Sequence, residues 1–467
     1  MLKEQFRARF QNKKVTVIGI GISNRPLIEM LVRAGANVTA CDKKTREALG
    51  SVYDELTALG VTLSLGEGYL DGIDAEIIFR TPGMRYDHPA LKKAVENGAI
   101  LTSEMQVFFE MCPATVIGIT GSDGKTTTTT LIYELLKREG KTVYLGGNIG
   151  EPLLPRLFGM TSDDFCVVEL SSFQLHTMTV SPHIAVITNL SPNHLDYHTS
   201  ETEYSEAKYH IFLHQTKDDV LVVNGESKTH LDCALHHFLN RRRCEMPTAR
   251  TERFFNGKTV YEKDGVIYCE GERVMPTSAI RIIGRHNVEN YMAAIAATKG
   301  LVSFSTVEAL AREFGGVEHR IEFIREVKGV SYYNSSIDSS PTRTAAALAA
   351  FGNKKLIVLA GGYDKNLDYA ELAPSLCRSA KAVILCGATA EKIRSSLVAS
   401  PDYREGAPKI VMTKDYKSSL EAAYRMAKAG DTVILSPASA SFDAFRNFEE
   451  RGRYFKSLVN ALPDNEE

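Results

Sequence analysis

The segment ITGSDGKTTTTTLIYELLK, residues 119–137, constrains the fold of this chain more than any other. A β-branched run leads into it and predicts a buried strand, and the later spacing of leucine and isoleucine predicts a helix. The turn between them carries Gly121 and Gly124, so its backbone amides can surround a polyphosphate at the positive end of the helix. Lys125 would reach the β- and γ-phosphates, and the Thr126 hydroxyl would bind Mg²⁺. We therefore predict that the chain binds ATP or GTP. The alternative is a glycine turn with an incidental lysine.

The composition is that of an ordinary globular enzyme. Of the 467 residues, 44% are hydrophobic and 24% are charged, and a chain of this length is expected to form two to four domains. The formal net charge of −2 gives no electrostatic reason to bind nucleic acid. No apolar run reaches the roughly 18 residues that span a bilayer, and the first residues contain no apolar signal core. The scattered cysteines form no C-x-x-C pair, which indicates reduced thiols in a cytoplasmic protein.

Strand and helix signals alternate at the beginning of the chain. Apolar strands are predicted at residues 14–20, 36–41 and 75–79, and helices at residues 26–33 and 90–97. This alternation is typical of an open parallel sheet.

The first turn of that sheet reads GIGISN, residues 19–24, and Asp42 ends the next predicted strand. The pattern is two-thirds of a dinucleotide fingerprint, because Asn24 stands where the third glycine or alanine belongs. By itself it leaves two alternatives open. One is a nicotinamide or flavin site, and the other is a site for some different phosphate-bearing ligand.

The whole chain reads as three α/β domains in series. The phosphate-loop strand begins immediately after Met111-Cys112-Pro113, and Gly315-Gly316-Val317 resembles a hinge. We therefore predict domains at residues 1–112, 113–317 and 318–467. Further strands are predicted at residues 165–169, 184–189, 220–224, 356–360, 382–386 and 432–435. A polar antiparallel excursion is predicted at residues 248–274 and a helix at residues 285–299.

Two later strand ends carry side chains suited to a metal. Glu169 ends a buried strand, and the carboxyl end of a strand is where ligands bind in an open α/β sheet. This carboxylate is therefore a candidate Mg²⁺ ligand, although a solvent-facing glutamate is the alternative. His194 and Asp196 follow the next strand, where they could form a second cation site or merely cap a helix.

Taken together, these motifs resemble the Mur ligase family of ATP-dependent amide-forming enzymes, which build the peptidoglycan stem peptide. The resemblance implies a Rossmann-like UDP-binding domain, a central P-loop ATPase domain with a mostly parallel sheet, and a Rossmann-like C-terminal domain. The matching segments follow the family order and are TGSDGKT (120–126), GGNIG (146–150), VELSSFQL (168–175), NLSPNHLD (189–196), EAK (206–208), GRHNVEN (284–290) and EHR (318–320).

The resemblance implies roles for single residues in the phosphoryl-transfer chemistry. Thr126 and Glu169 would hold one Mg²⁺, and His194 would hold a second. Lys208 matches a lysine that the family carbamylates with CO₂, which replaces an ammonium with an anion able to bind or orient a metal. Without the resemblance, Lys208 would be interpreted as a solvated cation. The catalytic set is Lys125, Glu169, His194 and Lys208, and the ATP-binding set is Gly121, Ser122, Asp123, Gly124, Lys125, Thr126, Thr127, Asn287, Asn290, Arg320 and Asp338.

The resemblance also implies the substrates. The segment LSPASASFDAFRNFEERG, residues 435–452, resembles the branch of the family that adds D-glutamate to UDP-N-acetylmuramoyl-L-alanine, and so does AGGYDK at residues 360–365. The GIGISN turn would then contact UDP and not a nicotinamide. The implied contacts to the UDP substrate are Gly21, Ile22, Ser23, Asn24, Asp42, Lys43, Asn148 and Ser171, and those to D-glutamate are Ser339, Lys365, Ser441 and Phe448.

The sequence departs from the family pattern at one position. Ser335 stands where many members have an aspartate that contacts the nucleotide, and Asp338 lies three residues later. We expect Asp338 to replace that contact. Ser339 stands where the family has a threonine, which keeps the hydroxyl.

Other functions compete with this interpretation. The chain could be a sister ligase or a folylpolyglutamate-synthase-like enzyme, a UDP-sugar-binding protein without turnover, or a nicotinamide-dependent oxidoreductase. Residues 435–452 favour D-glutamate over the sister substrates, and an oxidoreductase would leave the phosphate loop unexplained. We also expect the protein to act as a monomer.

Overall fold

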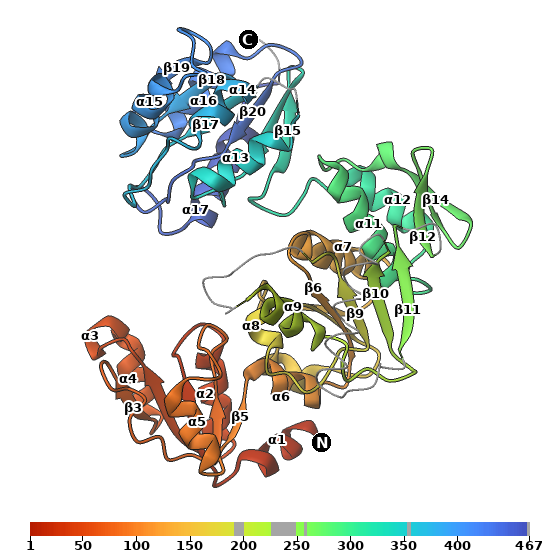
Figure 1. The fold of residues 1–467 in the computed structure, drawn as a ribbon, viewed down its shortest axis with the longest axis vertical. Coiled ribbons are helices and arrows are strands. Elements are labelled where there is room, and N and C mark those ends of the chain that lie inside the picture. Colours follow the sequence, from red (N-terminus) through yellow and green to blue (C-terminus); the bar gives the residue numbers. More distant parts are fainter. Residues whose placement is uncertain (191–199, 226–248, 256–258, 353–355, 465–467) are drawn as a thin grey trace. The chain divides into compact units, whose positions relative to one another are not determined.

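The computed structural model describes residues 1–190, 200–225, 249–255, 259–352 and 356–464, which form three α/β regions (Figure 1). Contacts divide the chain into two compact units. The first comprises residues 1–277 and 288–310, and the second comprises residues 278–287 and 311–467. The predicted fold class, three α/β domains in series with mostly parallel sheets, is confirmed by the three sheets. Within the described residues, no helix is both long and apolar enough to cross a bilayer.

The first sheet is parallel throughout and has the strand order β3-β2-β1-β4-β5. Its strands are β1 (Lys14–Ile18), β2 (Asn37–Asp42), β3 (Thr62–Leu65), β4 (Ile77–Phe79) and β5 (Ile100–Thr102). The helices of this region are α1 (Leu2–Phe10), α2 (Asn24–Arg33), α3 (Arg46–Leu49), α4 (Ser51–Ala58), α5 (Pro89–Glu96) and α6 (Glu104–Met111).

The central sheet has nine strands in the order β14-β13-β12-β11-β10-β9-β6-β8-β7. These are β6 (Thr115–Thr120), β7 (Val143–Gly147), β8 (Phe165–Glu169), β9 (Ile184–Ile187), β10 (Val220–Asn224), β11 (Arg250–Phe254), β12 (Val260–Lys263), β13 (Val266–Cys269) and β14 (Glu272–Pro276). The accompanying helices are α7 (Lys125–Arg138), η1 (Leu154–Gly159), α8 (Ser172–Leu175), α9 (Glu201–Tyr209), η2 (Thr277–Ala279), α11 (Arg285–Ala297) and α12 (Phe304–Glu313).

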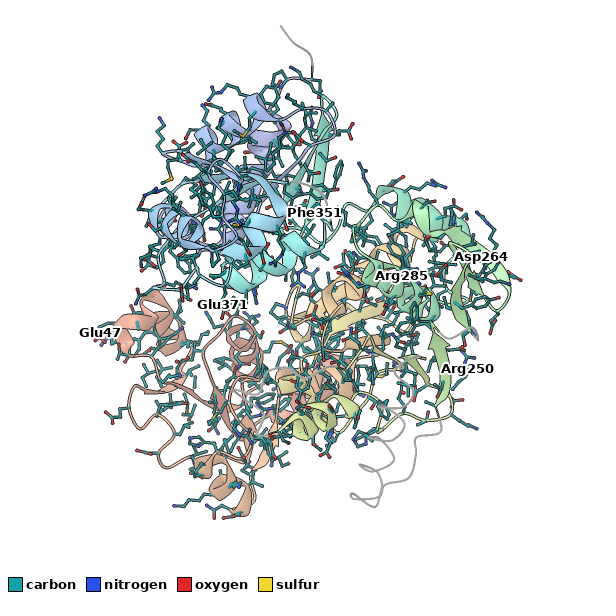
Figure 2. All side chains as sticks on the ribbon, turned by 45° about the horizontal axis from the view of Figure 1, so that its top comes forward. Glu47, Arg250, Asp264, Arg285, Phe351 and Glu371 are labelled. Carbon is teal, nitrogen blue, oxygen red and sulfur yellow. The ribbon has the colours of Figure 1, made fainter. Side chains whose placement is uncertain are left out.

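The predicted antiparallel excursion is present, because β12, β13 and β14 pair in antiparallel fashion at one end of this sheet. Arg250 at the start of β11 and Asp264 in the turn after β12 are both exposed (Figure 2). The polar pattern of this segment is therefore that of a sheet end facing solvent.

The third sheet has the order β15-β16-β20-β17-β18-β19, and every pair except β15 with β16 is parallel. Its elements are β15 (Glu322–Val327), β16 (Val330–Asn334), β17 (Leu356–Ala360), β18 (Ala380–Leu385), β19 (Lys409–Met412), β20 (Thr432–Leu435), α13 (Pro341–Ala349), α14 (Ala373–Ser379), α15 (Ala390–Ala399), α16 (Tyr416–Met426) and α17 (Phe448–Asn460).

Strand β17 shows why this region is a three-layer sandwich. Val358 packs in one core with residues of α13, α14 and α15, whereas Ile357 and Leu359 pack in a second core with residues of α16 and α17. Because side chains alternate across a strand, a run of apolar residues buries both faces of the sheet.

The first and central sheets share one hydrophobic core, although a domain boundary was predicted at residue 112. Phe10 and Phe79 belong to the same cluster as Leu154 and Leu157 of η1. The ring centroids of Phe6 and Phe158 lie 5.7 Å apart. This packing explains why both sheets fall in the first unit. The three predicted domain ranges remain a prediction.

A buried carboxyl group lies within this shared region. Glu104 begins α6 after the N-cap Ser103, is 8% exposed, and accepts a hydrogen bond of 3.1 Å from the backbone N–H of Leu154. Burial raises the pKa of Glu104 from 4.5 to about 7. The native state therefore keeps its proton at pH values where the unfolded chain has lost it, so stability is present below pH 4.5 and is lost as the pH rises towards 7.

We expect Glu104→Gln to remove this pH dependence. At about 1.4 kcal/mol per pH unit, the carboxyl group costs on the order of 3 kcal/mol above neutral pH. The urea midpoint of the variant should therefore exceed that of the wild type at pH 8 and match it at pH 4. Glu96→Gln, an exposed change on α5, is the control and should shift neither midpoint. Equal midpoints for wild type and Glu104→Gln at pH 8 would contradict the burial cost.

Candidate active site

The predicted phosphate loop lies between β6 and α7. Gly121 has φ +147° and Gly124 has φ +77°, conformations that glycine adopts without strain. Neighbouring atoms also exclude a side chain, because a Cβ on Gly121 would lie 1.9 Å from Oγ1 of Thr188 and one on Gly124 would lie 2.3 Å from Oδ1 of Asn290. Both glycines are therefore fixed by conformation and by close packing.

The loop is held in place by the end of β9. The backbone N–H of Ser122 donates to the carbonyl of Asn189 at 3.0 Å, and that of Asp123 donates to Asn189 Oδ1 at 2.9 Å. Thr188 Oγ1 donates to the carbonyl of Asp123 at 2.6 Å. Asn189 and Thr188 were not among the predicted site residues, although both lie at a predicted strand end.

Three predicted loop residues begin α7. Lys125 Nζ donates to the carbonyls of Gly121 and Ser122, both at 2.9 Å. Thr126 and Thr127 are half-buried in the first turn of the helix. The positive end of the helix and the lysine therefore lie together, as a phosphate site requires.

Glu169 lies at the end of β8, the neighbour of β6 in the sheet, and is 1% exposed. Its Oε1 accepts a hydrogen bond of 2.9 Å from Nδ2 of Asn148, and its Oε2 is buried with no hydrogen-bond partner within the described residues. A solvent-facing glutamate is therefore excluded. An unsatisfied buried carboxylate oxygen at the carboxyl end of a strand next to the phosphate-loop strand fits a divalent cation. His194 and Asp196 lie outside the described residues.

Lys208 of α9 is 1% exposed, so the interpretation as a solvated cation does not hold. Its Nζ donates to the carbonyl of Gly121 at 2.9 Å and to Oγ1 of Thr120 at 3.4 Å. Burial is the main cause that lowers the pKa of this amine to about 7, and the positive charge of Lys125 adds to it. The structure thus brings Lys208 directly against the phosphate loop.

Tyr204 supports this arrangement and was not predicted from the sequence. Its ring lies 4.6 Å from Nζ of Lys208, and its hydroxyl donates to Ser122 Oγ at 3.2 Å. The only available signal was its position four residues before Lys208, which puts both side chains on one face of a helix.

The first sheet carries a cavity of about 500 Å³ at the end of β1. Three of the predicted UDP contacts line it, namely Gly21, Asp42 and Lys43, and Thr81, Tyr69 and His88 also do so without having been predicted. Asp42 Oδ2 accepts a hydrogen bond of 2.7 Å from the backbone N–H of Ile20. The carboxylate therefore fixes the turn that forms the cavity wall.

The other predicted UDP contacts lie elsewhere. Ile22 is 84% exposed and Ser23 is exposed. Asn24 is buried, and its Nδ2 donates to the carbonyls of Ile18 and Gly19 at 3.1 and 2.9 Å. The oxygen of Ser171 caps α8 by accepting from the backbone N–H of Gln174 at 3.3 Å. Asn24 and Ser171 thus have structural roles in their turns.

Asn287 and Asn290, the two asparagines of the predicted ATP-binding set, are both buried. Asn290 Oδ1 accepts a hydrogen bond of 3.3 Å from Oγ1 of Thr128 in α7, so Asn290 lies beside the phosphate loop. Asn287 Nδ2 donates to the carbonyl of Ile283 at 2.7 Å.

In the second unit, Asp338 is 6% exposed and its Oδ2 accepts a hydrogen bond of 2.8 Å from Oγ of Ser436. Burial raises its pKa to about 6. Ser335 is fully buried, and its Oγ accepts from the backbone N–H of Ile321 at 3.1 Å. The serine thus fixes the backbone next to Arg320, which is exposed.

The predicted D-glutamate residues all belong to this unit. Ser441 is 2% exposed, and Ser339 Oγ donates to the carbonyl of Ile337 at 3.1 Å. Lys365 is exposed, with its Nζ 5.5 Å from the ring centroid of Phe442. Phe448 is half-buried and meets the ring of His319 edge to face.

Arg451 connects the loop that carries Ser339 with the loop that carries Ser441, and it was not predicted. It is fully buried, and its guanidinium donates to the carbonyls of Ser336, Ser439 and Ala440 at 2.9 to 3.0 Å. The carboxyl edge of the third sheet is therefore held by one arginine.

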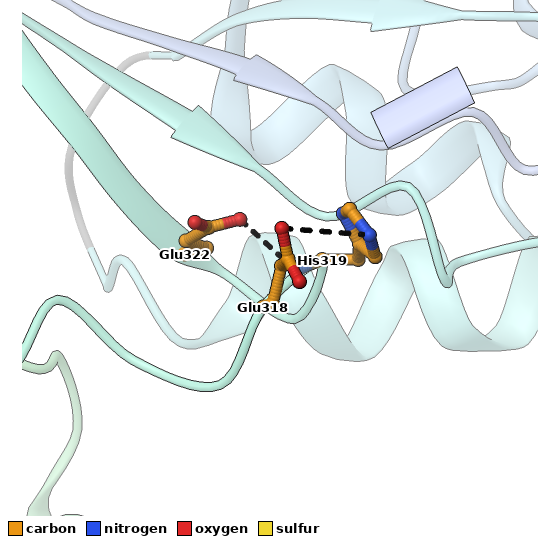
Figure 3. Close-up of side chains that lie close together, drawn as sticks. All are labelled: Glu318, His319 and Glu322. Atoms are coloured by element: carbon orange, nitrogen blue, oxygen red, sulfur yellow. Dashed lines mark hydrogen bonds and ion pairs between the residues drawn. The ribbon is translucent and has the colours of Figure 1, made fainter. Parts of the chain in front are cut away.

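Three side chains of types that can bind a metal ion lie close together beside Arg320, namely those of Glu318, His319 and Glu322 (Figure 3). Lys456 already contacts both carboxylates, with its Nζ 3.6 Å from Oε1 of Glu318. Asn334 Nδ2 lies 2.9 Å from His319 Nδ1 and 3.0 Å from Glu322 Oε2. The cluster is therefore a hydrogen-bonded network closed by a lysine.

Comparison with known proteins agrees with this geometry. Residues 119–298 match the Mur ligase middle domain, and residues 319–439 match the glutamate ligase domain of the Mur ligases. The UDP-N-acetylmuramoylalanine–D-glutamate ligase of Acetivibrio thermocellus is 48% identical over 98% of both chains. The enzyme of the same name from Clostridium botulinum (strain Okra, type B1) is 47% identical over 98% of this chain and 99% of its own.

A solved structure extends the comparison to the fold. The UDP-N-acetylmuramate–alanine ligase of Thermotoga maritima has 18% sequence identity and a TM-score of 0.54, with 96% of this chain and 99% of that chain covered. The resemblance seen in the sequence motifs is thereby confirmed over the full length. This chain belongs to the Mur ligase family.

Proposed function

We propose that this chain is an ATP-dependent ligase that joins D-glutamate to UDP-N-acetylmuramoyl-L-alanine in cytoplasmic peptidoglycan precursor synthesis. The observation that carries the proposal is the meeting of the phosphate loop, the Glu169 carboxylate and the buried Lys208 amine at the carboxyl edge of one sheet. Ligands of open α/β sheets bind at this edge. Membership of the Mur ligases and the names of the full-length relatives support the choice of substrates.

The reaction follows from the groups at this edge. The loop amides and Lys125 would hold the γ-phosphoryl oxygens of ATP. The alanyl carboxylate of the UDP substrate attacks the γ-phosphorus, the bond to the β–γ bridging oxygen breaks, and ADP leaves. The amine of D-glutamate then attacks the acyl phosphate, loses a proton and displaces phosphate, which leaves an amide. Positioning and charge neutralisation supply most of the acceleration in such transfers.

Mg²⁺, when bound, neutralises phosphate charge and polarises the transferred phosphoryl group. Thr126 and Glu169 are the residues that would hold one ion, because the second oxygen of Glu169 has no partner within the described residues. His194 and a carbamylated Lys208 would hold or orient a second.

We further propose that Lys208 is carbamylated. Only a neutral amine attacks CO₂, and at a pKa of about 7 roughly half of the Lys208 side chains are neutral at pH 7. The new N–C bond forms as a proton leaves, which yields a carbamate anion beside Lys125 and the phosphate loop. Carbon-13 NMR of the protein in labelled bicarbonate should show a carbamate signal that Lys208→Met lacks.

The acceptor amino acid would bind in the second unit. Lys365 and the hydroxyls of Ser339 and Ser441 suit the carboxylates of D-glutamate, and Phe448 offers an apolar wall. Arg320, which is exposed beside the Glu318–His319–Glu322 network, would contact an ATP phosphate. We also propose that the chain acts as a monomer, because one chain carries every group that the mechanism uses.

The test is phosphate release from ATP and Mg²⁺ with UDP-N-acetylmuramoyl-L-alanine and a panel of amino acids. Release that requires both the UDP substrate and D-glutamate supports the proposal. Release with L-glutamate, a diamino acid or a folate acceptor would assign the chain to a sister activity. Binding of the UDP substrate without release would indicate a protein that has lost turnover.

A separate prediction concerns Asp338, the aspartate that lies three residues after Ser335. Asp338→Ala should raise the KM for ATP or lower kcat by roughly tenfold, the size expected for a lost charge-assisted hydrogen bond. Ser335→Ala should leave both constants within about twofold, because its Oγ accepts a hydrogen bond from the protein's own backbone. Steady-state kinetics at varied ATP concentration distinguishes the two. The reverse pattern would mean that position 335 carries the nucleotide contact.

A further inference from the structure

The turn that follows β4 is folded around a buried arginine. Arg80 is 2% exposed, and its Nη1 donates to the carbonyl of Pro82 at 3.0 Å, to that of Thr81 at 3.3 Å and to that of Met84. Thr81 and Met84 line the cavity of the first sheet. The wall of that cavity therefore depends on where this guanidinium lies.

The other end of the same guanidinium contacts α8 and the residues that follow it. Arg80 Nη2 donates to the carbonyl of Phe173 at 3.1 Å and to Oγ1 of Thr177 at 3.2 Å. Phe173 belongs to α8, which begins three residues after Glu169. The Arg80 guanidinium thus joins the cavity wall to α8, the helix that follows the candidate metal ligand Glu169.

A second arginine in this turn repeats the connection. Arg85 Nη2 donates to Oε1 of Glu203 at 3.1 Å and to Oδ2 of Asp87 at 2.9 Å. Glu203 lies on α9, the helix that carries Lys208. The segment 80–87 therefore contacts α8, which follows Glu169, and α9, which carries Lys208. A guanidinium presents five N–H donors in a rigid planar fork, whereas a lysine ammonium is one compact donor group, so lysine could not reproduce the five contacts that Arg80 Nη1 and Nη2 make.

We propose that Arg80 is a positioning residue, which fixes the cavity of the first sheet relative to Glu169 so that a nucleotide bound in that cavity presents its acyl group to the phosphate loop. The inference rests on the proposed function, because it assigns the cavity to the UDP substrate. Arg80 itself contacts neither reacting atom. Its contribution is to hold the Thr81–Met84 turn against α8.

The test compares two variants that remove different parts of this connection. Arg80→Met keeps much of the side-chain volume and removes every hydrogen bond, whereas Thr177→Val removes only the hydroxyl on the α8 side. We expect kcat for phosphate release to fall about 30-fold in Arg80→Met and about fivefold in Thr177→Val. The KM for ATP should stay within about twofold in both. Arg33→Met, on an exposed residue of α2, is the control and should change nothing.

A second readout is independent of turnover. Amide hydrogen exchange of the peptides that contain residues 81–84 and 172–177 should accelerate in Arg80→Met. Calorimetry without ATP measures the affinity for the UDP substrate, and this affinity should fall by a smaller factor than kcat. An unchanged kcat in Arg80→Met would overturn the proposal. So would a loss confined to substrate affinity, which would make Arg80 part of the cavity alone. Failure of the proposed function is distinguishable, because the wild type would then release no phosphate.

Discussion

Lys208→Ala is expected to lower kcat for phosphate release by about a thousandfold, with the KM values for ATP and the UDP substrate within about threefold. The reason is the position of the side chain. Its Nζ lies 2.9 Å from the carbonyl of Gly121 and is almost completely buried, so alanine removes the only proposed anion-forming group at that end of the loop. Removal of one preorganised group that stabilises charge in the transition state typically costs about 10² to 10³ in rate. Excess bicarbonate should not restore the activity.

Two further variants separate chemistry from stability. Lys208→Met retains an apolar stem of similar length, so its loss of activity cannot be attributed to a cavity in the core. Lys217→Ala changes an exposed lysine after the same helix and should retain full activity. Thermal unfolding of each protein shows whether the fold survives. Near-normal turnover of Lys208→Ala would exclude the assigned role.

Glu169→Gln is expected to reduce kcat by a similar factor, about 10² to 10³. The amide can still accept the hydrogen bond from Asn148, so the end of β8 should keep its structure. What is lost is the negative charge of the buried Oε2, which is the atom without a partner within the described residues. An amide is a much weaker ligand for Mg²⁺ than a carboxylate, and the Mg²⁺ concentration needed for half-maximal activity should rise.

Phosphate release at increasing Mg²⁺ concentration measures this effect. Glu272→Gln, an exposed change on β14 of the same sheet, should behave as the wild type. The thermal midpoint of Glu169→Gln should not fall, because the substitution removes a buried charge and keeps the side-chain shape. An unchanged Mg²⁺ dependence would mean that another group holds the ion.

Most buried strands could be predicted from the sequence, whereas several strands at the ends of the sheets could not. The structure places strands at 165–169, 220–224, 356–360 and 432–435, the same bounds that the apolar runs predict. Strands β3, β7 and β19 were not predicted, and each lies at the end of its sheet with half-buried side chains. A strand covered on one side only lacks the continuous apolar run that marks a central parallel strand.

The candidate site divides in the same way. The sequence by itself determined the phosphate loop and the carboxylate at the end of β8, because a glycine turn and a strand end are properties of a few consecutive residues. Only the tertiary structure decided that Lys208 is buried against Gly121, that Asn148 holds Glu169, and that Arg80 joins the turn after β4 to α8. The contacts of the phosphate loop with β8 and with the residues after β9 depend on β6 lying between these two strands. Strand order and side-chain burial arise from the packing of segments far apart in the chain, so a local sequence pattern does not predict them.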